Sequence, residues 1–291
     1  MRRLRPALAT VAALLAVAVG GVWFVGGLLV APAQRAVAEP TDLAVEPFTI
    51  DSPNGPLAAW ALPADSARGT VVLMHGVRAD RGSQRERMRL FGEAGYHVVA
   101  FDFQAHGESP GDAITFGARE RHDAVAAVAA ARQRFGGPVA VVGQSMGGAA
   151  ALLAGPALDA DALVVEAVYA DIERATRNRI GMRLGPLAGP LAAVLTAQLR
   201  PRLGLSVDSL RPADAARRVE APLLVLVGSE DTHATPAESR QIHDAATGPK
   251  ALWTVEGAAH QDLYRFAPDA YARRVLGFLD THLGVRGDDS P

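Results

Sequence analysis

The stretch Val139-Ala-Val-Val-Gly-Gln-Ser-Met-Gly-Gly148 runs four apolar residues into a Gly-x-Ser-x-Gly motif, and a row of alanine and leucine follows it. This order predicts a strand, a sharp turn at Ser145 and a helix. Because the turn strains the serine backbone, its neighbours must be small, and Gly143 and Gly147 would remove clashes between strand and helix. The Ser145 hydroxyl would then project beyond the strand, with the backbone N–H of Met146 directed at a developing oxyanion.

Length and composition limit the classes of protein that remain. The chain has 291 residues, of which 49% are apolar, enough for one large α/β domain with a short appendage. A net charge of −2 argues against nucleic acid as the main partner. The absence of cysteine excludes disulfides, thiolate metal sites and a cysteine nucleophile. No zinc-protease, phosphate-loop or dinucleotide motif occurs, so no cofactor and no metal is predicted.

The amino-terminal stretch is apolar enough to cross a membrane. Ala7–Val30 contains 24 residues without a charge, and Arg2, Arg3 and Arg5 precede it. At about 1.5 Å per residue, a helix of this length spans a hydrocarbon core of about 30 Å. We expect a single transmembrane helix that leaves the arginines in the cytoplasm and exports the catalytic domain.

A cleaved signal peptide is the alternative, and it would make the protein secreted. Ala31-Pro-Ala33 and Ala36-Val-Ala38 both show the small-x-small pattern of a cleavage site. We favour the anchor because the apolar run exceeds the usual 7–15 residues of a signal core. The predicted division is an anchor at 1–30, a linker at 31–45, an α/β-hydrolase domain at 46–283 and a tail at 284–291.

Apolar strands alternate with helices on both sides of the serine motif. This alternation predicts a mostly parallel sheet covered on both faces. Glu46–Asp51 and Leu57–Ala61 flank a turn-rich pentapeptide and predict a hairpin at a sheet edge. The arginine-rich run Arg81–Arg89 is interpreted as a solvated helix face. Further strands are predicted at 70–76, 97–103, 139–145, 162–166, 222–228 and 251–255, and further helices at 116–135, 235–246 and 268–283.

The segment of about 50 residues from Asp171 to Val219 interrupts this rhythm, because a crossover between strands normally needs far fewer. Within it, the charge-free stretch Leu184–Leu199 is too short and too often broken by Gly-Pro to span a membrane. We interpret the segment, about 171–219, as a helical cap that covers Ser145 and lines an apolar pocket. The alternative is a surface excursion packed on the sheet edge.

A serine nucleophile needs a histidine base within hydrogen-bond reach and an acid to orient that base. Ligands of such sheets bind beyond the carboxyl ends of the strands. Of the eight histidines, that position selects His75, His106, His233 and His260. His260 is the preferred base because it follows the last strand in a loop of small residues.

Three carboxylates also follow strand ends and compete for the role of the acid. Asp231 lies in Gly228-Ser-Glu-Asp231, directly after an apolar strand, whereas Glu166 and Asp171 follow the preceding strand. The neighbouring Glu230 would point elsewhere in a regular backbone.

With these motifs the chain resembles the α/β-hydrolases. Among them it is similar to the BEM46/ABHD13-like serine hydrolases, which are related to S33-type serine aminopeptidase domains. The resemblance covers about residues 45–283. It implies an α/β-hydrolase fold with a mostly parallel central sheet, helices on both faces and a short helical cap. The matching motifs are His75-Gly76-Val77, the loop from Asp102 to Ser109, Gly228-Ser-Glu-Asp231 and Gly257-Ala-Ala-His260.

The resemblance also implies roles for individual residues. The family's chain order of Ser, Asp and His gives Ser145, Asp231 and His260 as the catalytic triad. Its His-Gly-x motif implies the Val77 N–H as the second oxyanion donor, beside that of Met146. His75 is then expected to support the loop rather than to catalyse, and turn roles are favoured for His106 and His233.

The sequence therefore predicts a serine hydrolase that cleaves carboxylic esters, with a preference for lipophilic ones, through an acyl-enzyme on Ser145. The expected partners are a small-molecule or lipid-like acyl ester and the membrane, without a cofactor and without nucleic acid. An S33-type amidase or peptidase is the alternative within the enzymes. A non-catalytic scaffold that binds a lipid or a partner at the membrane is the alternative outside them.

Overall fold

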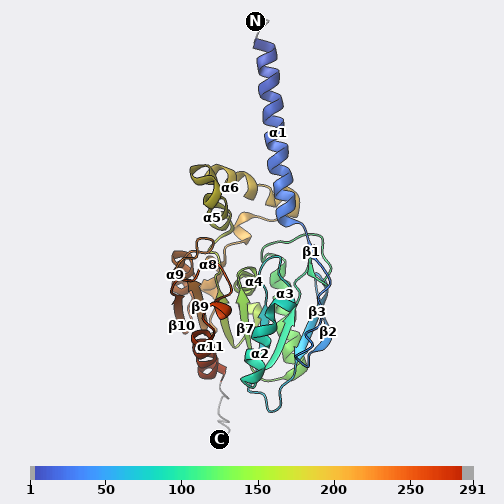
Figure 1. The fold of residues 1–291 in the computed structure, drawn as a ribbon, viewed down its shortest axis with the longest axis vertical. Coiled ribbons are helices and arrows are strands. Elements are labelled where there is room, and N and C mark those ends of the chain that lie inside the picture. Colours follow the sequence, from blue (N-terminus) through green and yellow to red (C-terminus); the bar gives the residue numbers. More distant parts are fainter. Residues whose placement is uncertain (1–3, 284–291) are drawn as a thin grey trace.

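The strand that precedes Ser145 lies near the middle of an eight-stranded sheet with the order β10-β9-β8-β7-β4-β5-β3-β2 (Figure 1). In this computed structural model the described residues are 4–283, so Arg2, Arg3 and the expected tail at 284–291 lie outside them. The strands are β2 (Glu46–Ser52), β3 (Gly55–Leu62), β4 (Thr70–Met74), β5 (His97–Phe101), β7 (Val139–Gln144), β8 (Ala162–Glu166), β9 (Leu223–Gly228) and β10 (Lys250–Val255).

The sheet confirms the predicted α/β-hydrolase architecture. From β10 to β5 all neighbouring strands are parallel, and β3 and β2 add an antiparallel hairpin at one edge. The central strands are apolar and buried on both faces, as parallel strands under helices must be.

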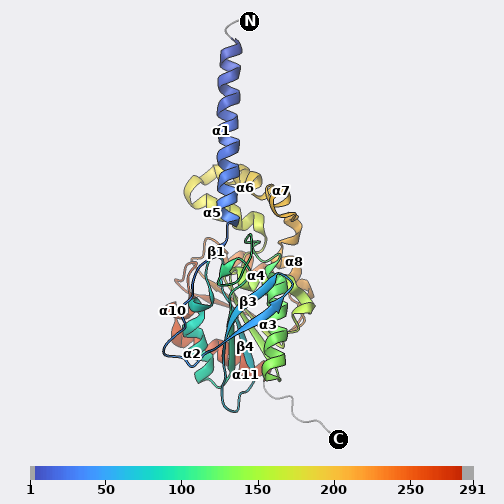
Figure 2. The same cartoon turned by 90° about the vertical axis from the view of Figure 1, so that its right-hand side faces the viewer.

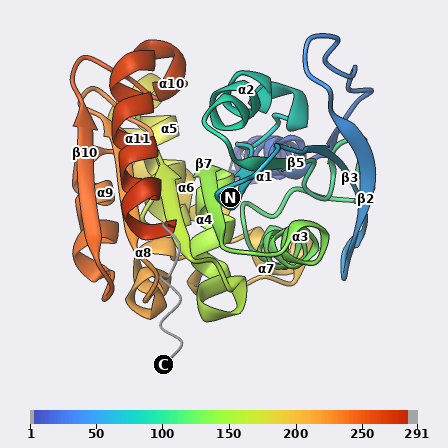
Figure 3. The ribbon, with the colours of Figure 1, turned by 90° about the horizontal axis from the view of Figure 1, so that it is seen from below.

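Two hydrophobic clusters cover the two faces of the sheet. One cluster packs α3 and α4 on the sheet, and the other packs α2 and α11 on the opposite side. Figure 3 shows α2 and α3 on opposite sides of the strands. The helices of this domain are α2 (Arg85–Glu93), α3 (Glu120–Phe135), α4 (Met146–Ala154), α8 (Pro212–Ala215), α9 (Pro236–Ala245), α10 (Leu263–Phe266) and α11 (Pro268–Leu283).

The long insertion after β8 folds into helices at one end of the sheet. It contains α5 (Ile172–Leu184), α6 (Ala188–Thr196) and α7 (Leu199–Leu203), and α5 packs against α6. By length and composition, Ile172–Leu203 is the one helical stretch in the described chain that is apolar enough to cross a membrane. The stretch is divided among these three helices, so it does not form one straight rod.

The amino-terminal helix α1 (Leu4–Val30) projects from the same end of the molecule as the insertion (Figure 2). Within the described residues, the apolar helical part at this end is Val19–Val30, which is shorter than a membrane span, so the membrane anchor stays a prediction. The expected linker at 31–45 is attached to the domain, because β1 (Ala33–Gln34) pairs in parallel with β6 (His106–Gly107).

The prediction of a solvated helix face at Arg81–Arg89 is wrong for two of its arginines. The side chains of Arg81 and Arg87 are only 5% and 1% exposed. Arg87 lies 2.8 Å from Glu166, and Arg81 pairs with the buried Asp102. Strand ends bring these acids to the helix, and a buried charge is tolerated when it is paired in this way.

Candidate active site

The turn between β7 and α4 holds Ser145 in the strained conformation that the motif predicts. Its φ of 47° and ψ of −110° lie in a region that a residue with a side chain rarely adopts. A Cβ added at Gly143 would lie 2.6 Å from the Gly148 nitrogen, and one at Gly147 would collide with the Met74 carbonyl. Glycine is therefore required where the strand, the helix and β4 meet.

His75 holds the loop after β4 in place through two hydrogen bonds. The Nε2 atom of His75 accepts a hydrogen bond from the Phe103 N–H at 3.1 Å, so its Nδ1 carries the proton and donates to the Gly76 carbonyl at 2.8 Å. Burial, together with the nearby His106, lowers the pKa of His75 to about 3. A neutral, fully buried imidazole with both nitrogens bonded supports this loop.

The same loop brings the Val77 backbone to the nucleophile. A Cβ added at Gly76 would lie 3.7 Å from the Ser145 Cβ, and Val77 and Met146 line one cavity with Ser145. Met146 is the first residue of α4, so its N–H has no partner within the helix. Among the described residues the Val77 N–H donates to no acceptor either. Both backbone donors are available to a ligand.

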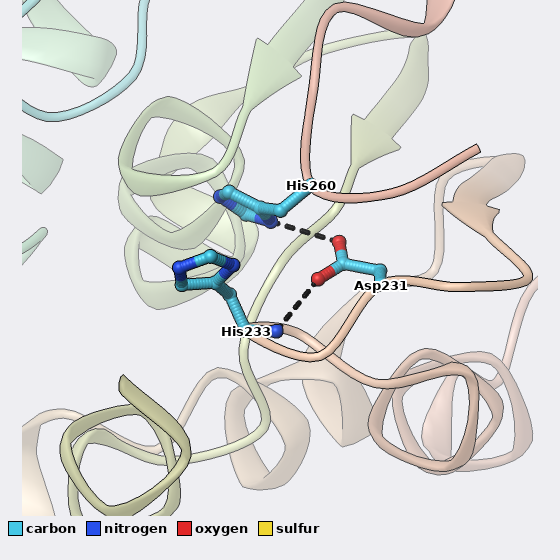
Figure 4. Close-up of side chains that lie close together, drawn as sticks. All are labelled: Asp231, His233 and His260. Atoms are coloured by element: carbon cyan, nitrogen blue, oxygen red, sulfur yellow. Dashed lines mark hydrogen bonds and ion pairs between the residues drawn. The ribbon is translucent and has the colours of Figure 1, made fainter. Parts of the chain in front are cut away.

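The loops after β9 and β10 bring Asp231 and His260 together (Figure 4). His260 Nδ1 lies 2.8 Å from Asp231 Oδ2, and the Asp231 side chain is fully buried. The other carboxylate oxygen accepts from the backbone N–H groups of His233 and Ala234, at 2.8 and 2.9 Å. With Nδ1 directed at Asp231, the Nε2 atom of His260 is left for a substrate-side group. No hydrogen bond joins it to Ser145 in the described structure, and such bonds often tighten only when substrate binds.

The competing carboxylates are engaged elsewhere. Glu166 is buried between Arg87 and the Tyr271 hydroxyl, and Asp171 caps α5 by accepting from the Arg174 N–H at 2.8 Å. Glu230 is exposed. Of these four carboxylates in the described chain, only Asp231 has the geometry of an orienting acid for His260.

A largely apolar cavity of about 180 Å³ joins these groups. Ser145, Val77, Met146 and His260 line it, together with side chains from the insertion and from α1. The charge-free stretch contributes only its carboxyl end, from Leu195 to Leu199, whereas Leu187 is 67% exposed outside the cavity. The insertion, called the cap below, therefore lines the cavity beside Ser145, and α5 contributes as much of the wall as the charge-free stretch.

Sequence reasoning favoured a turn role for His233, and the structure places it in the cavity. Its ring lies 4.8 Å from that of His260, centroid to centroid, and burial and the charge of His260 lower its pKa. The ligand atoms of Asp231, His233 and His260 lie within 4.8 Å of one another, a spacing that a metal ion could also use. His106, by contrast, is buried away from the cavity, with Nδ1 2.9 Å from the Gln104 carbonyl.

Comparison with known proteins gives the family and the fold. The model of the serine aminopeptidase S33 family matches residues 65–210. These residues include the turn at Ser145 (the nucleophile elbow), the loop after β4 that contains Val77 (the oxyanion loop) and most of the cap. A protein of Bacillus subtilis (strain 168) described as uncharacterized protein YqkD is 27% identical over 241 residues, covering 80% of this chain and 78% of that one.

Solved structures with the same fold include two bacterial or archaeal hydrolases. The Pyrococcus furiosus esterase Pf2001 has a TM-score of 0.73 at 21% identity, and the match covers 88% of this chain and 99% of that one. XC6422 from Xanthomonas campestris, described as an α/β serine hydrolase without lid, has a TM-score of 0.57 at 18% identity over 88% of this chain and all of that one. At these identities the likeness establishes the fold alone.

Proposed function

The chain belongs to the serine aminopeptidase S33 family of α/β-hydrolases, and on this premise we propose that it cleaves carboxylic esters through an acyl-enzyme on Ser145. One observation carries the proposal. A strained serine, a histidine paired to a buried aspartate and two available backbone N–H groups converge on one apolar cavity. This is the set of groups that acyl transfer to a serine needs.

In the proposed mechanism, His260 removes the Ser145 proton as the oxygen attacks the acyl carbonyl. Asp231 holds the imidazole in the correct tautomer and stabilises the imidazolium that forms. The N–H groups of Val77 and Met146 bind the oxyanion, and losing one such donor typically costs about 2.7–4 kcal/mol. His260 then protonates the leaving alcohol, and water releases the acyl group by the same route.

An ester is favoured over a peptide by the lining of the cavity. None of the described residues that line it is acidic, whereas Arg179 and Arg202 are cationic, so nothing there would attract a substrate's amine. Alkoxide leaving groups also need less assistance than amines. The apolar lining further supports a preference for lipophilic acyl groups.

We propose further that α1 anchors the protein in a membrane, with the catalytic domain exported. The uncharged run Ala7–Val30 and the arginines before it support this proposal. The cap lies at the same end of the molecule as α1, and it also exposes apolar side chains (Figure 2). These cap side chains are Met182, Leu184, Leu187 and Val194. Protease added to intact cells should digest the domain, and a domain cut only after lysis would contradict this topology.

The proposed reaction is tested with esters and anilides that carry the same acyl group. We expect the ester to turn over at least about 100-fold faster, and Asp231→Asn to lower kcat by about 10⁴-fold. Glu230→Gln and Asp171→Asn are the matched controls and should retain activity. Faster anilide cleavage would indicate the peptidase alternative, and no turnover with any acyl substrate would indicate the scaffold.

A further inference from the structure

The last turns of α1 pack closely against the cap. A Cβ added at Gly26 would lie 2.9 Å from Cδ of Gln198, the residue before α7, so a larger residue would force the Gln198 side chain to move. The Gln198 side chain donates to the Val22 carbonyl at 3.1 Å. The Arg202 guanidinium lies 3.9 Å from the centre of the Trp23 ring. Gln198 and Arg202 of the cap thus join it to a helix that is far away in the sequence.

The end of α1 is also attached to the catalytic domain. The Ile114 N–H donates to the Val30 carbonyl at 2.8 Å, and the Arg78 guanidinium donates to the carbonyls of Leu28 and Leu29. These bonds satisfy carbonyl groups that the end of any helix leaves unpaired. Because Arg78 follows Val77, the helix has a fixed position relative to the oxyanion loop.

This fixed position makes α1 part of the cavity. Gly26, Leu29 and Val30 line it together with Ser145 and His260, whereas the adjacent Leu28 does not. A segment expected only to tether the protein therefore supplies one wall of the space next to the nucleophile.

We propose that the carboxyl end of α1 is a binding wall for the acyl chain, so that the enzyme selects esters whose chain is long enough to lie between α1 and the cap. This inference rests on the proposed function of the same cavity. It predicts that cleavage after Ala33 or Ala38, as by a signal peptidase, would remove one wall and with it the selection for chain length.

The test compares Leu29→Ala with Leu28→Ala in the full chain in detergent micelles. Both leucines are exposed on the same turn, at 42% and 54%, but only Leu29 lines the cavity. The measured quantity is the ratio of kcat/KM for a dodecanoyl ester to kcat/KM for an acetyl ester. We expect Leu29→Ala to lower this ratio about fivefold, because apolar contact with the long chain is lost, and Leu28→Ala to leave it unchanged.

A photoreactive probe gives a second readout that does not depend on a variant. A long-chain fluorophosphonate with a diazirine at the chain terminus would first label Ser145 and then crosslink to its nearest neighbours on irradiation. We expect the crosslink in the tryptic peptide Leu4–Arg35, which contains α1. Two results together would contradict a role of α1 in binding the acyl chain. One is labelling at Ser145 with crosslinks only outside α1, and the other is an equal ratio of dodecanoyl to acetyl kcat/KM in the two leucine variants. Absence of both labelling and ester turnover would instead reject the proposed hydrolase.

Discussion

Arg78 donates a hydrogen bond from its guanidinium to the carbonyl oxygen of Leu28, and this contact attaches the oxyanion loop to the end of α1. Arg78 itself has a φ of 60°, in the left-handed region that favours glycine. The backbone at this position favours glycine, so the contact of the side chain with α1 is the reason for an arginine here.

This contact yields the first prediction. Arg78→Gly relieves the backbone strain but releases the loop from α1, so we expect kcat for a short ester to fall about tenfold, less than the loss of a whole oxyanion donor. Arg78→Lys keeps a cation near the helix carbonyls and should recover part of the rate. Steady-state kinetics decides the matter, and an unchanged kcat in the glycine variant would show that the contact does not position Val77.

Removing one partner of the buried ion pair between Arg87 and Glu166 should cause a large loss of stability. Arg87 contacts Glu166 at 2.8 Å and Asp262 at 2.9 Å, so Arg87→Met leaves a buried carboxylate unpaired and should lower the free energy of unfolding by about 3–5 kcal/mol. Arg85→Met, on the same helix, breaks an exposed pair with Asp42 and should cost less than about 1 kcal/mol. Denaturant titration of both variants in micelles measures the difference, and equal losses would contradict it.

Buried Asp123 predicts a dependence of stability on pH. Burial raises its pKa to about 6, against 3.8 for an exposed aspartate. The native state thus keeps a proton that the unfolded chain has released. The resulting stabilisation is complete below about pH 4 and is lost as the pH rises through about 6, a change of about 3 kcal/mol. His75, whose pKa is lowered, contributes a pH dependence of the opposite sign in the same range. The test is therefore the difference between wild type and Asp123→Asn: the stability of the wild type relative to this variant should fall by about 3 kcal/mol from about pH 4 to pH 7.

The control for this titration is Asp112→Asn, which makes the same change of charge at an 85% exposed side chain. Free energies of unfolding between pH 4 and 7 should show the wild-type pH dependence in this control. A pH dependence in Asp123→Asn that is the same as that of the wild type would contradict the assignment to Asp123.

The cluster of Asp231, His233 and His260 allows a test of metal dependence. Both carboxylate oxygens of Asp231 already accept hydrogen bonds, so we expect ester hydrolysis to proceed without an added ion. EDTA should leave the rate within about twofold, and Zn²⁺ should inhibit by occupying His260. Loss of activity in EDTA that a divalent metal restores would make the cluster a metal centre.

The parts of the molecule that the sequence predicts are those set by neighbouring residues. The strands could be predicted because their apolar runs are continuous, and the elbow because its glycines and serine are adjacent in the chain. Asp231 and His260 were identified as candidates because each follows a strand, and parallel strands place their carboxyl ends at one edge.

Contacts between distant residues could not be predicted in this way. Arg87 meets Glu166 and Asp262 across 79 and 175 residues, so its burial is not visible in an arginine-rich run. Gln198 reaches Val22 across 176 residues, and the adjacent Gly26-Gly27 pair resembles an interruption of an apolar helix. His233 enters the cavity because its backbone N–H binds Asp231, a geometry that its loop sequence does not specify.

A nucleophilic Ser145 is tested most directly by locating the site of covalent labelling by a fluorophosphonate in the full-length protein and in Ser145→Ala. We expect one adduct, on the peptide that contains Ser145, and no adduct in the variant. We also expect hydrolysis of a p-nitrophenyl ester to fall by about 10⁴-fold or more in the variant, since triad members typically contribute at least this much. Labelling that persists in Ser145→Ala, or a folded variant that keeps more than about one hundredth of the wild-type rate, would contradict a nucleophilic Ser145.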